Sequence, residues 1–145
     1  MLTIGPLAPD DRAAWEALFA GYNEFYGRVL GPELMDRAWR EFQSGERMHA
    51  LGGRLDGELV GITHFLTHPS TTSQDVCYLQ DLFTAPAARG QGVARALIEA
   101  VADWSRRRGL SRVYWHTQDG NTTARRLYDQ IGVHRGFIVY QVPLL

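Results

Sequence analysis

The 145-residue sequence has no lysine, a single cysteine and no long apolar segment. Because Cys77 has no second cysteine to pair with, an internal disulfide and a cysteine-based zinc site are both excluded. No apolar run approaches the ~20 residues that a membrane-spanning helix needs. The first residues also lack the basic and apolar segments of a secretory signal peptide. These absences predict a cytoplasmic protein that works without a membrane and without a metal ion.

The composition is that of one globular domain over residues 1–145, since 45% of the residues are hydrophobic and 21% are charged. The net charge of −1 is unevenly distributed. Residues 1–75 hold eleven acidic and six basic side chains, whereas residues 76–145 hold five and nine. The second half therefore suits an anionic ligand. The run Arg106-Arg107-Arg108 is a weak indication of nucleic-acid binding, because cations near the end of a helix also complement its dipole. No nucleic-acid partner is expected.

Apolar spacing divides the chain into helices and strands without repeats or linkers. The first predicted helix has Trp15, Leu18, Phe19 and Tyr22 on one face, with Asp10 or Asp11 as its cap. Three further helices follow Pro32, Gly92 and Asn121. Strands are expected near residues 2–7, 49–55, 58–66, 76–84, 112–117 and 136–142, with Asp56-Gly57 as a hairpin turn. This order, β-α-α-β-β-β-α-β-α-β, predicts one mixed α/β (α+β) domain with a mostly antiparallel sheet flanked by helices.

The segment from Thr84 to Val93 carries the first functional motif. A run of strand-forming residues ends at Thr84, and Arg89-Gly90-Gln91-Gly92-Val93-Ala94 then leads directly into a helix. The free N–H groups of a helix's first turn bind anions, and glycines without a Cβ let a phosphate approach the main chain. The alternative is a strand-to-helix turn that uses glycine for its geometry alone. Glycine patterns this short are weak evidence by themselves.

A second motif joins the first, and together they resemble the GCN5-related N-acetyltransferase (GNAT) superfamily. Arg89 to Ala94 matches the superfamily pattern of Arg or Gln, two residues, Gly, one residue, then Gly or Ala. The later block Asn121-Thr-Thr-Ala-Arg-Arg-Leu-Tyr128-Asp-Gln-Ile-Gly132 matches the helix that carries Asn, Ala, Leu-Tyr and Gly at this spacing. The segment 114–117 resembles the histone/polyamine acetyltransferase-like branch, which also acts on small amines.

The resemblance implies acetyl-CoA as the co-substrate. The N–H groups from Gly90 to Arg95 would hold the pyrophosphate, and the pantetheine arm would pair with the backbone of the strand before the loop, as an added strand does. Asn121 would bond the arm from the other side. The implied cofactor-binding residues are Leu82, Phe83, Thr84, Arg89, Gly90, Gln91, Gly92, Val93, Ala94, Arg95, Asn121 and Tyr128.

Acyl transfer from a thioester requires a proton acceptor for the amine, a donor for the oxyanion and a proton for the thiolate. The resemblance assigns Tyr128 as the general acid, and the backbone N–H of Phe83 is the candidate oxyanion donor. The alternative for Tyr128 is a core aromatic at helical spacing.

The base is left open between several groups. The polyamine acetyltransferases carry Glu where this chain has Gln80, which cannot accept a proton. Neighbouring strand residues face opposite sides, so Gln80 and Asp81 share one cleft only if a bulge intervenes. Asp81 is a candidate base, a substrate-ammonium ligand or a structural group. His116 and a water chain are alternatives, whereas His64, His68 and His134 have weaker claims.

The acceptor is expected to be a small cationic amine. The carboxylate of Glu24 has the aromatic residues Tyr22 and Tyr26 close to it in the sequence, a combination that suits an organic cation. Core packing is the alternative explanation for these residues. With Gln80 and His116 they form the predicted acceptor site. A protein lysine or N-terminus as the acceptor, and a non-catalytic acyl-CoA-binding module, are the alternatives. Only one predicted strand follows Gly132, so we also expect an open sheet edge and a homodimer.

Overall fold

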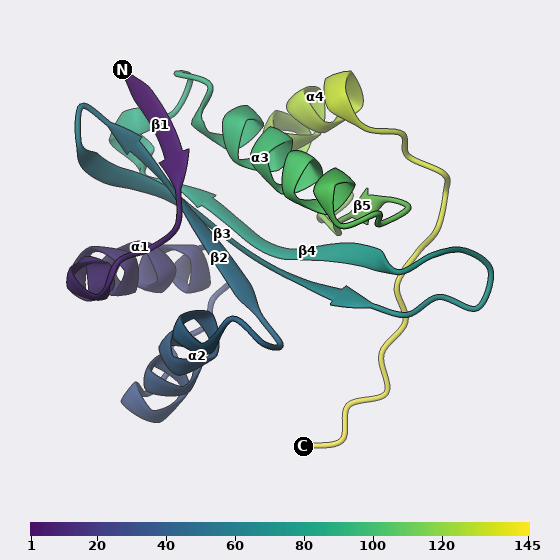
Figure 1. Cartoon of the computed structure of the whole chain (residues 1–145), viewed down its shortest axis with the longest axis horizontal. Coiled ribbons are helices and arrows are strands. Elements are labelled where there is room, and N and C mark those ends of the chain that lie inside the picture. The colour runs from purple at the N-terminus through teal and green to yellow at the C-terminus, as the bar shows by residue number, and fades with distance from the viewer.

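The computed structural model describes residues 1–145 as one mixed sheet with helices on both faces (Figure 1). The helices are α1 (Arg12–Phe25), α2 (Pro32–Ser44), α3 (Val93–Arg107) and α4 (Thr122–Ile131), and the strands are β1 (Leu2–Gly5), β2 (His49–Leu55), β3 (Glu58–His68), β4 (Val76–Thr84) and β5 (Val113–Tyr114). The strand order is β1-β2-β3-β4-β5, and only the β4–β5 pair is parallel. The predicted fold class is confirmed.

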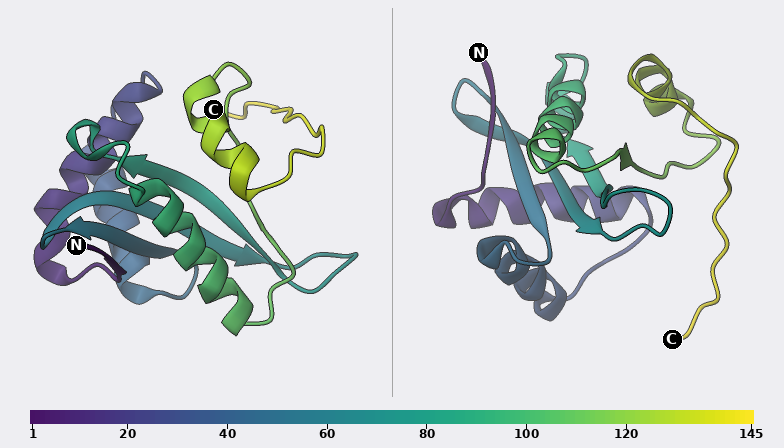
Figure 2. Two further views of the ribbon diagram at one scale, coloured as in Figure 1. Left: turned by 90° about the horizontal axis from the view of Figure 1, so that it is seen from above. Right: turned by 45° about the vertical axis from the view of Figure 1, so that its right-hand side comes forward.

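The helices divide into two layers around the sheet, α1 and α2 on one face and α3 and α4 on the other (Figures 1 and 2). Trp15, Phe19 and Trp39 pack against the sheet in the first layer. Leu97 and Val101 of α3 are fully buried in the second. No helix is both long and apolar enough to cross a membrane.

Helix boundaries follow the local sequence, with one correction. Gly45 ends α2 in a left-handed conformation at φ 67°, as glycine allows. The prediction that an aspartate side chain caps α1 is wrong. Asp11 precedes the helix without a side-chain cap. Its carboxylate accepts the Ala8 N–H at 2.7 Å and pairs with Arg54, because the neighbouring strand supplies a stronger partner.

The start of α3 lies unusually close to the sheet because β3 has a glycine beneath it. A Cβ at Gly61 would lie 2.6 Å from Cγ1 of Val93 and 3.1 Å from Cδ1 of Leu97. No larger residue fits there without moving the helix. This close packing fixes the first turn of α3, and with it the glycine loop, relative to the end of β4.

Strand β4 is paired along one edge and largely unpaired along the other. Its whole length lies against β3, whereas β5 pairs only at Cys77↔Val113 and Tyr78↔Tyr114. The strand predicted over residues 112–117 is therefore reduced to two residues. From Leu79 to Thr84 the second edge of β4 has no neighbouring strand, so its backbone groups are available to a ligand.

A bulge on β4 changes which side chains face α1. The register runs His64↔Asp81 and then Phe65↔Leu79, which leaves Gln80 as an extra residue opposite no partner. Leu79 therefore faces the α3 layer, whereas Asp81 faces α1. The structure therefore contains the bulge that Gln80 and Asp81 need in order to face the same side of the sheet.

The strand predicted over residues 136–142 is absent. The chain after α4 forms no strand and runs along the outside of the molecule as an extended segment (Figure 2). Its apolar side chains are exposed, including Phe137, Val139 and Tyr140. Strand formation needs a hydrogen-bonding neighbour, and this segment reaches none within the chain.

Candidate active site

The glycine loop forms the open N-terminus of α3. Gly90 and Gly92 adopt φ values of 79° and 82°, which side chains rarely tolerate. A Cβ at either position would meet no atom within 4 Å, so the space in front of the loop is free. Gly92 is the N-cap and makes no side-chain capping bond. The first N–H groups of the helix are left for an anionic ligand.

The other predicted members of the loop divide between backbone and side-chain roles. The Val93 side chain is buried beneath α3, so only its backbone faces the loop. Nε of Arg89 donates to the Thr84 carbonyl at 3.2 Å, and the guanidinium lies 5.6 Å from the Phe83 ring. Arg95 donates instead to the Gln130 side chain of α4. Gln91 is exposed and Ala94 half-buried.

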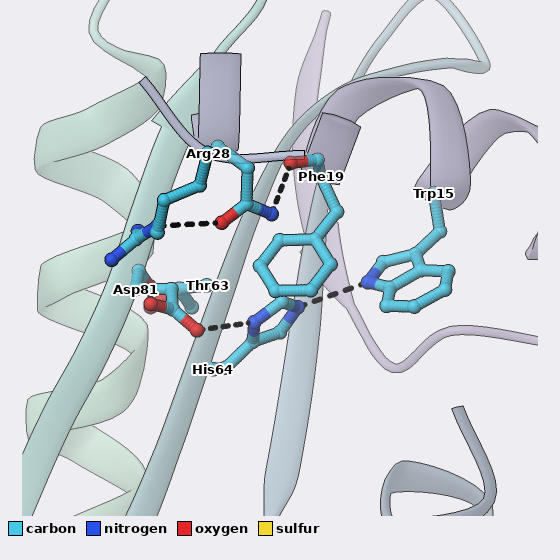
Figure 3. Close-up of polar contacts among 7 residues, drawn as sticks. Trp15, Phe19, Arg28, Thr63, His64 and Asp81 are labelled. Atoms are coloured by element: carbon cyan, nitrogen blue, oxygen red, sulfur yellow. Dashed lines mark hydrogen bonds and ion pairs between the residues drawn. The ribbon is translucent and has the colours of Figure 1, made fainter. Parts of the chain in front are cut away.

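A chain of three hydrogen-bonded side chains runs from the core to the open part of β4 (Figure 3). Nε1–H of Trp15 donates to Nε2 of His64 at 2.9 Å, and Nδ1 of His64 lies 2.9 Å from Oδ2 of Asp81. The His64 side chain is 1% exposed and the Asp81 side chain 14% exposed. The Asp81 carboxylate is thus the outer end of a buried polar chain.

The Trp15 hydrogen bond decides the tautomer of His64. The indole N–H only donates, so Nε2 must accept and the ring hydrogen lies on Nδ1. From there it points at Asp81. The imidazole cannot turn, because it stacks on Phe42 at 4.3 Å and meets the edge of Phe19 at 4.9 Å. One carboxylate oxygen of Asp81 is therefore held in place by His64.

Two tyrosines, one from α1 and one from β4, lie near Asp81. Burial raises the pKa of Tyr22 on α1, and the nearby Asp81 carboxylate adds to the increase. Burial and then the same carboxylate raise the pKa of Tyr78 on β4. Tyr26 packs on Tyr22 at 5.1 Å between ring centres. The Tyr22 and Tyr78 hydroxyls therefore stay protonated at neutral pH and can donate hydrogen bonds toward the carboxylate.

Tyr128 reaches this group from the other face of the sheet. Its ring packs against Trp115 at 5.4 Å. Burial raises the pKa of its hydroxyl, and Tyr26 adds to the increase, so the two tyrosines lie near each other where β4 and β5 separate. A tyrosine that stays protonated can donate a hydrogen bond to a sulfur that gains negative charge, and can pass it a proton as the carbon–sulfur bond breaks.

The remaining predicted residues lie at different distances from this cleft. Nδ1 of His116 lies 3.3 Å from the Tyr78 hydroxyl, at the edge of the tyrosine group. Gln80 is exposed. Glu24 lines a separate groove with Phe83 and Arg89, so the structure does not bring it together with Tyr22 and Tyr26 around one carboxylate.

Asn121 is first of all a helix cap. Its Oδ1 accepts the Ala124 N–H at 3.4 Å, and its Nδ2 donates to Oγ1 of Thr117 at 3.3 Å. One N–H of the amide has no partner within the chain. Asn121 can therefore donate one bond to a ligand while it still holds the start of α4.

Sequence reasoning underrated His64 and did not find Trp15 as its partner. His64 lies opposite Asp81 only because of the strand register, and the register depends on a bulge that carries no glycine or proline. The sequence also contains no indication of a role for Asn23, which is buried (3% exposed), or for Arg28, which follows α1.

Comparison with known proteins gives the family. The model of the Acetyltransferase (GNAT) family matches residues 15–133, which include both motifs and the Asp81 cleft. The chain belongs to this family. It is an N-acetyltransferase, and the resemblance seen in its two motifs is confirmed.

Relatives cover nearly the whole chain. The D-amino-acid N-acetyltransferase HPA3 of Saccharomyces cerevisiae is 30% identical over 97% of this chain and 89% of its own length. The uncharacterized N-acetyltransferase YhfO of Bacillus subtilis is 29% identical over 96% and 95%. The crystal structure of ribosomal-protein-alanine N-acetyltransferase from Brucella melitensis biovar Abortus 2308 has a TM-score of 0.83 at 26% identity, over 99% of this chain and 100% of that one.

Replacing His64 tests the buried chain. His64→Phe keeps an aromatic ring but leaves both the Trp15 N–H and an Asp81 oxygen unpaired. We expect it to lower the free energy of unfolding by about 2 kcal/mol or more, since a buried polar group without a partner costs ~1–3 kcal/mol. Urea unfolding measures this loss. The control is His68→Phe, at a partly exposed histidine that does not belong to the Trp15–His64–Asp81 hydrogen bonds. It should lower the free energy of unfolding by less. Equal losses would contradict a special role for the His64 hydrogen bonds.

Proposed function

We propose that the protein transfers the acetyl group of acetyl-CoA to the primary amine of a small, positively charged molecule. The observation that carries this proposal is the Asp81 carboxylate, held by His64 at the open edge of β4 with Tyr22 and Tyr78 near it. It has no ion pair with a lysine or arginine within the chain. An ammonium group is the partner that such a carboxylate lacks.

The co-substrate fits the groups next to this carboxylate. The N–H groups from Gly90 to Arg95 lie in the loop and first turn of α3, where the space beside Gly90 and Gly92 is open, and they suit a pyrophosphate. The unpaired edge of β4 at Leu82, Phe83 and Thr84 suits the amides of the pantetheine arm, which would pair as an added strand. The free N–H of Asn121 approaches from α4. The thioester would then lie where β4 and β5 separate, beside Asp81 and Tyr128.

The reaction divides among three groups. The bound ammonium first releases one proton to solvent. The neutral amine nitrogen then forms a bond to the thioester carbon and gives a second proton to Asp81 or to a water molecule beside it. The N–H of Leu82 or Thr84, on the free edge of β4, stabilises the oxyanion that develops on the carbonyl oxygen. Phe83, the first candidate, pairs with Ile62 and its N–H faces β3, because the Ala85 N–H donates to Val60 and backbone groups alternate along the strand. The carbon–sulfur bond then breaks, and the Tyr128 hydroxyl gives its proton to the sulfur. The proton from the amine returns to Tyr128 through the cleft, so both side chains end as they began.

Free amino acids and polyamines are the acceptors that the residues around Asp81 suit best. The Tyr22 and Tyr78 hydroxyls lie near one carboxylate, and Tyr26 packs on Tyr22, a setting that suits an ammonium group. The yeast relative is named for amino acids as acceptors. The Brucella structure is named for a protein acceptor, so a peptide belongs in the same assay.

We also propose a homodimer. The segment after α4 exposes Phe137, Ile138, Val139 and Tyr140, and β5 has only two paired residues. Pairing between copies would bury these side chains and complete the sheet. Sedimentation velocity should show a dimer, and Val139→Asp with Tyr140→Asp should shift it to a monomer. A monomeric unaltered protein at micromolar concentration would contradict the proposal.

The central test follows CoA release with a panel of acceptors, comparing the unaltered protein with Tyr128→Phe. The panel holds polyamines, amino acids, aromatic amines and a peptide. We expect turnover on small amines and a drop of about 10²- to 10⁴-fold in kcat for Tyr128→Phe, the range for loss of a general acid. Acetyl-CoA binding should be unchanged, as measured by calorimetry.

Two outcomes would contradict the proposal. Full activity in Tyr128→Phe would remove the tyrosine from the mechanism. Tight acetyl-CoA binding by the unaltered protein without turnover on any amine would indicate an acyl-CoA-binding module. Leu34→Ser is the control, because Leu34 lies on α2, outside the cleft and the proposed dimer contact, and is 42% exposed.

A further inference from the structure

Arg28 occupies an unusual position at the end of α1. The helix ends at Phe25, and Gly27 turns the chain with a φ of 70°. The Arg28 N–H then donates to the Asn23 carbonyl at 2.8 Å, and its Nε donates to Asn23 Oδ1 at 3.1 Å. The result is an arginine whose backbone and side chain are held by the same residue.

Asn23 is itself fixed in the core. It is 3% exposed, and its Nδ2 donates to the Phe19 carbonyl at 2.8 Å. The two bonds from Arg28 satisfy the main-chain carbonyl oxygen and the side-chain Oδ1 of this buried asparagine. They also orient the guanidinium, since a bond at Nε leaves both terminal nitrogens free and in one plane.

The guanidinium lies over the rings of the cleft. Its carbon is 5.1 Å from the Tyr26 ring centre and 5.7 Å from that of Tyr22. It forms no ion pair with a carboxylate of the chain, unlike Arg12 and Arg54, which do. Both terminal nitrogens of an exposed, oriented arginine are therefore available to a ligand.

Arg28 and Asp81, which carry opposite charges, both affect the pKa of Tyr22: Asp81 raises it and Arg28 lowers it. The Arg28 cation and the Asp81 anion both lie close enough to the Tyr22 hydroxyl to influence its ionisation. Figure 3 shows the two side chains on the same side of His64, with Arg28 in the segment that follows α1 and Asp81 on β4. The cleft thus presents a fixed positive group beside a fixed negative one.

We propose that Arg28 binds the carboxylate of the acceptor, which makes the acceptor an amino acid rather than a polyamine. This inference rests on the proposed acetyl transfer at Asp81. An α-amino acid carries its ammonium and carboxylate on one carbon, so it satisfies both charges at once. The fork of terminal N–H groups matches a carboxylate in a bidentate bond. The second ammonium of a polyamine would instead face the Arg28 cation and be repelled.

The test compares an amino acid with its amide. Methionine and methioninamide, each in the D and L forms, have the same side chain and differ in the carboxylate. The kcat/KM values for both are measured with the unaltered protein and with Arg28→Gln. Because each substrate is compared with itself across the two proteins, differences in intrinsic amine reactivity cancel.

For Arg28→Gln we expect kcat/KM on the amino acid to fall about 10- to 100-fold, mainly through KM, as for a lost charge-assisted bond. The value for the amide should change little. Arg28→Lys should restore part of the loss, since it returns the charge without the fork. Arg107→Gln, at an exposed arginine on α3, controls for the change in net charge and should leave both substrates unaffected.

Two results would overturn the inference while leaving acetyl transfer intact. One is an equal fall on the amino acid and the amide, which would make Arg28 structural. The other is a preference of the unaltered protein for polyamines over amino acids. Absence of turnover on every amine would overturn both the inference and the proposed function.

Discussion

The bulge on β4 is the constraint on which the site depends. One extra residue, Gln80, separates the pairs Phe65↔Leu79 and His64↔Asp81. Without it, residues at odd positions would continue to face α3, and the carboxylate of Asp81 would point into a hydrophobic layer. With it, Leu79 stays in that layer while Asp81 turns toward α1. The same strand then loses β5 as a neighbour just beyond Tyr78, so the redirected side chain lies at the point where the backbone edge becomes free.

The buried hydrogen bonds behind Asp81 explain how a carboxylate is kept there. Trp15 fixes the tautomer of His64, and His64 satisfies one oxygen of Asp81. A neutral imidazole donor holds the carboxylate but leaves its negative charge in place. An arginine partner would neutralise that charge. The remaining charge is left for an ammonium group. The tyrosines near it supply hydrogen bonds and apolar surface that a small amine requires. The glycine loop at the end of β4 leaves N–H groups that suit the phosphates of the proposed co-substrate.

Much of this was predictable from sequence, since local chemistry determined it. The two glycines with positive φ, the Asp56-Gly57 turn, the Asn121 cap and the aromatic face of α1 each depend on residues within a few positions of one another. His64 and Arg28 were not found because their roles depend on contacts across the fold. His64 meets Asp81 through a strand register, and Arg28 is placed by a buried asparagine. The expected last strand failed for a related reason: its alternating apolar residues need a neighbour that one copy of the chain does not supply.

A crystal structure of the protein with CoA and an amino acid tests the account most directly. We expect the pantetheine arm along the free edge of β4 at Leu82 to Thr84, with the amine nitrogen within hydrogen-bonding distance of Asp81. The Tyr128 hydroxyl should point at the sulfur. An amine bound on the Glu24 side of α1, or a CoA arm that leaves the edge of β4 unpaired, would contradict it. Either result would mean that the bulge and the chain behind Asp81 serve stability rather than acetyl transfer.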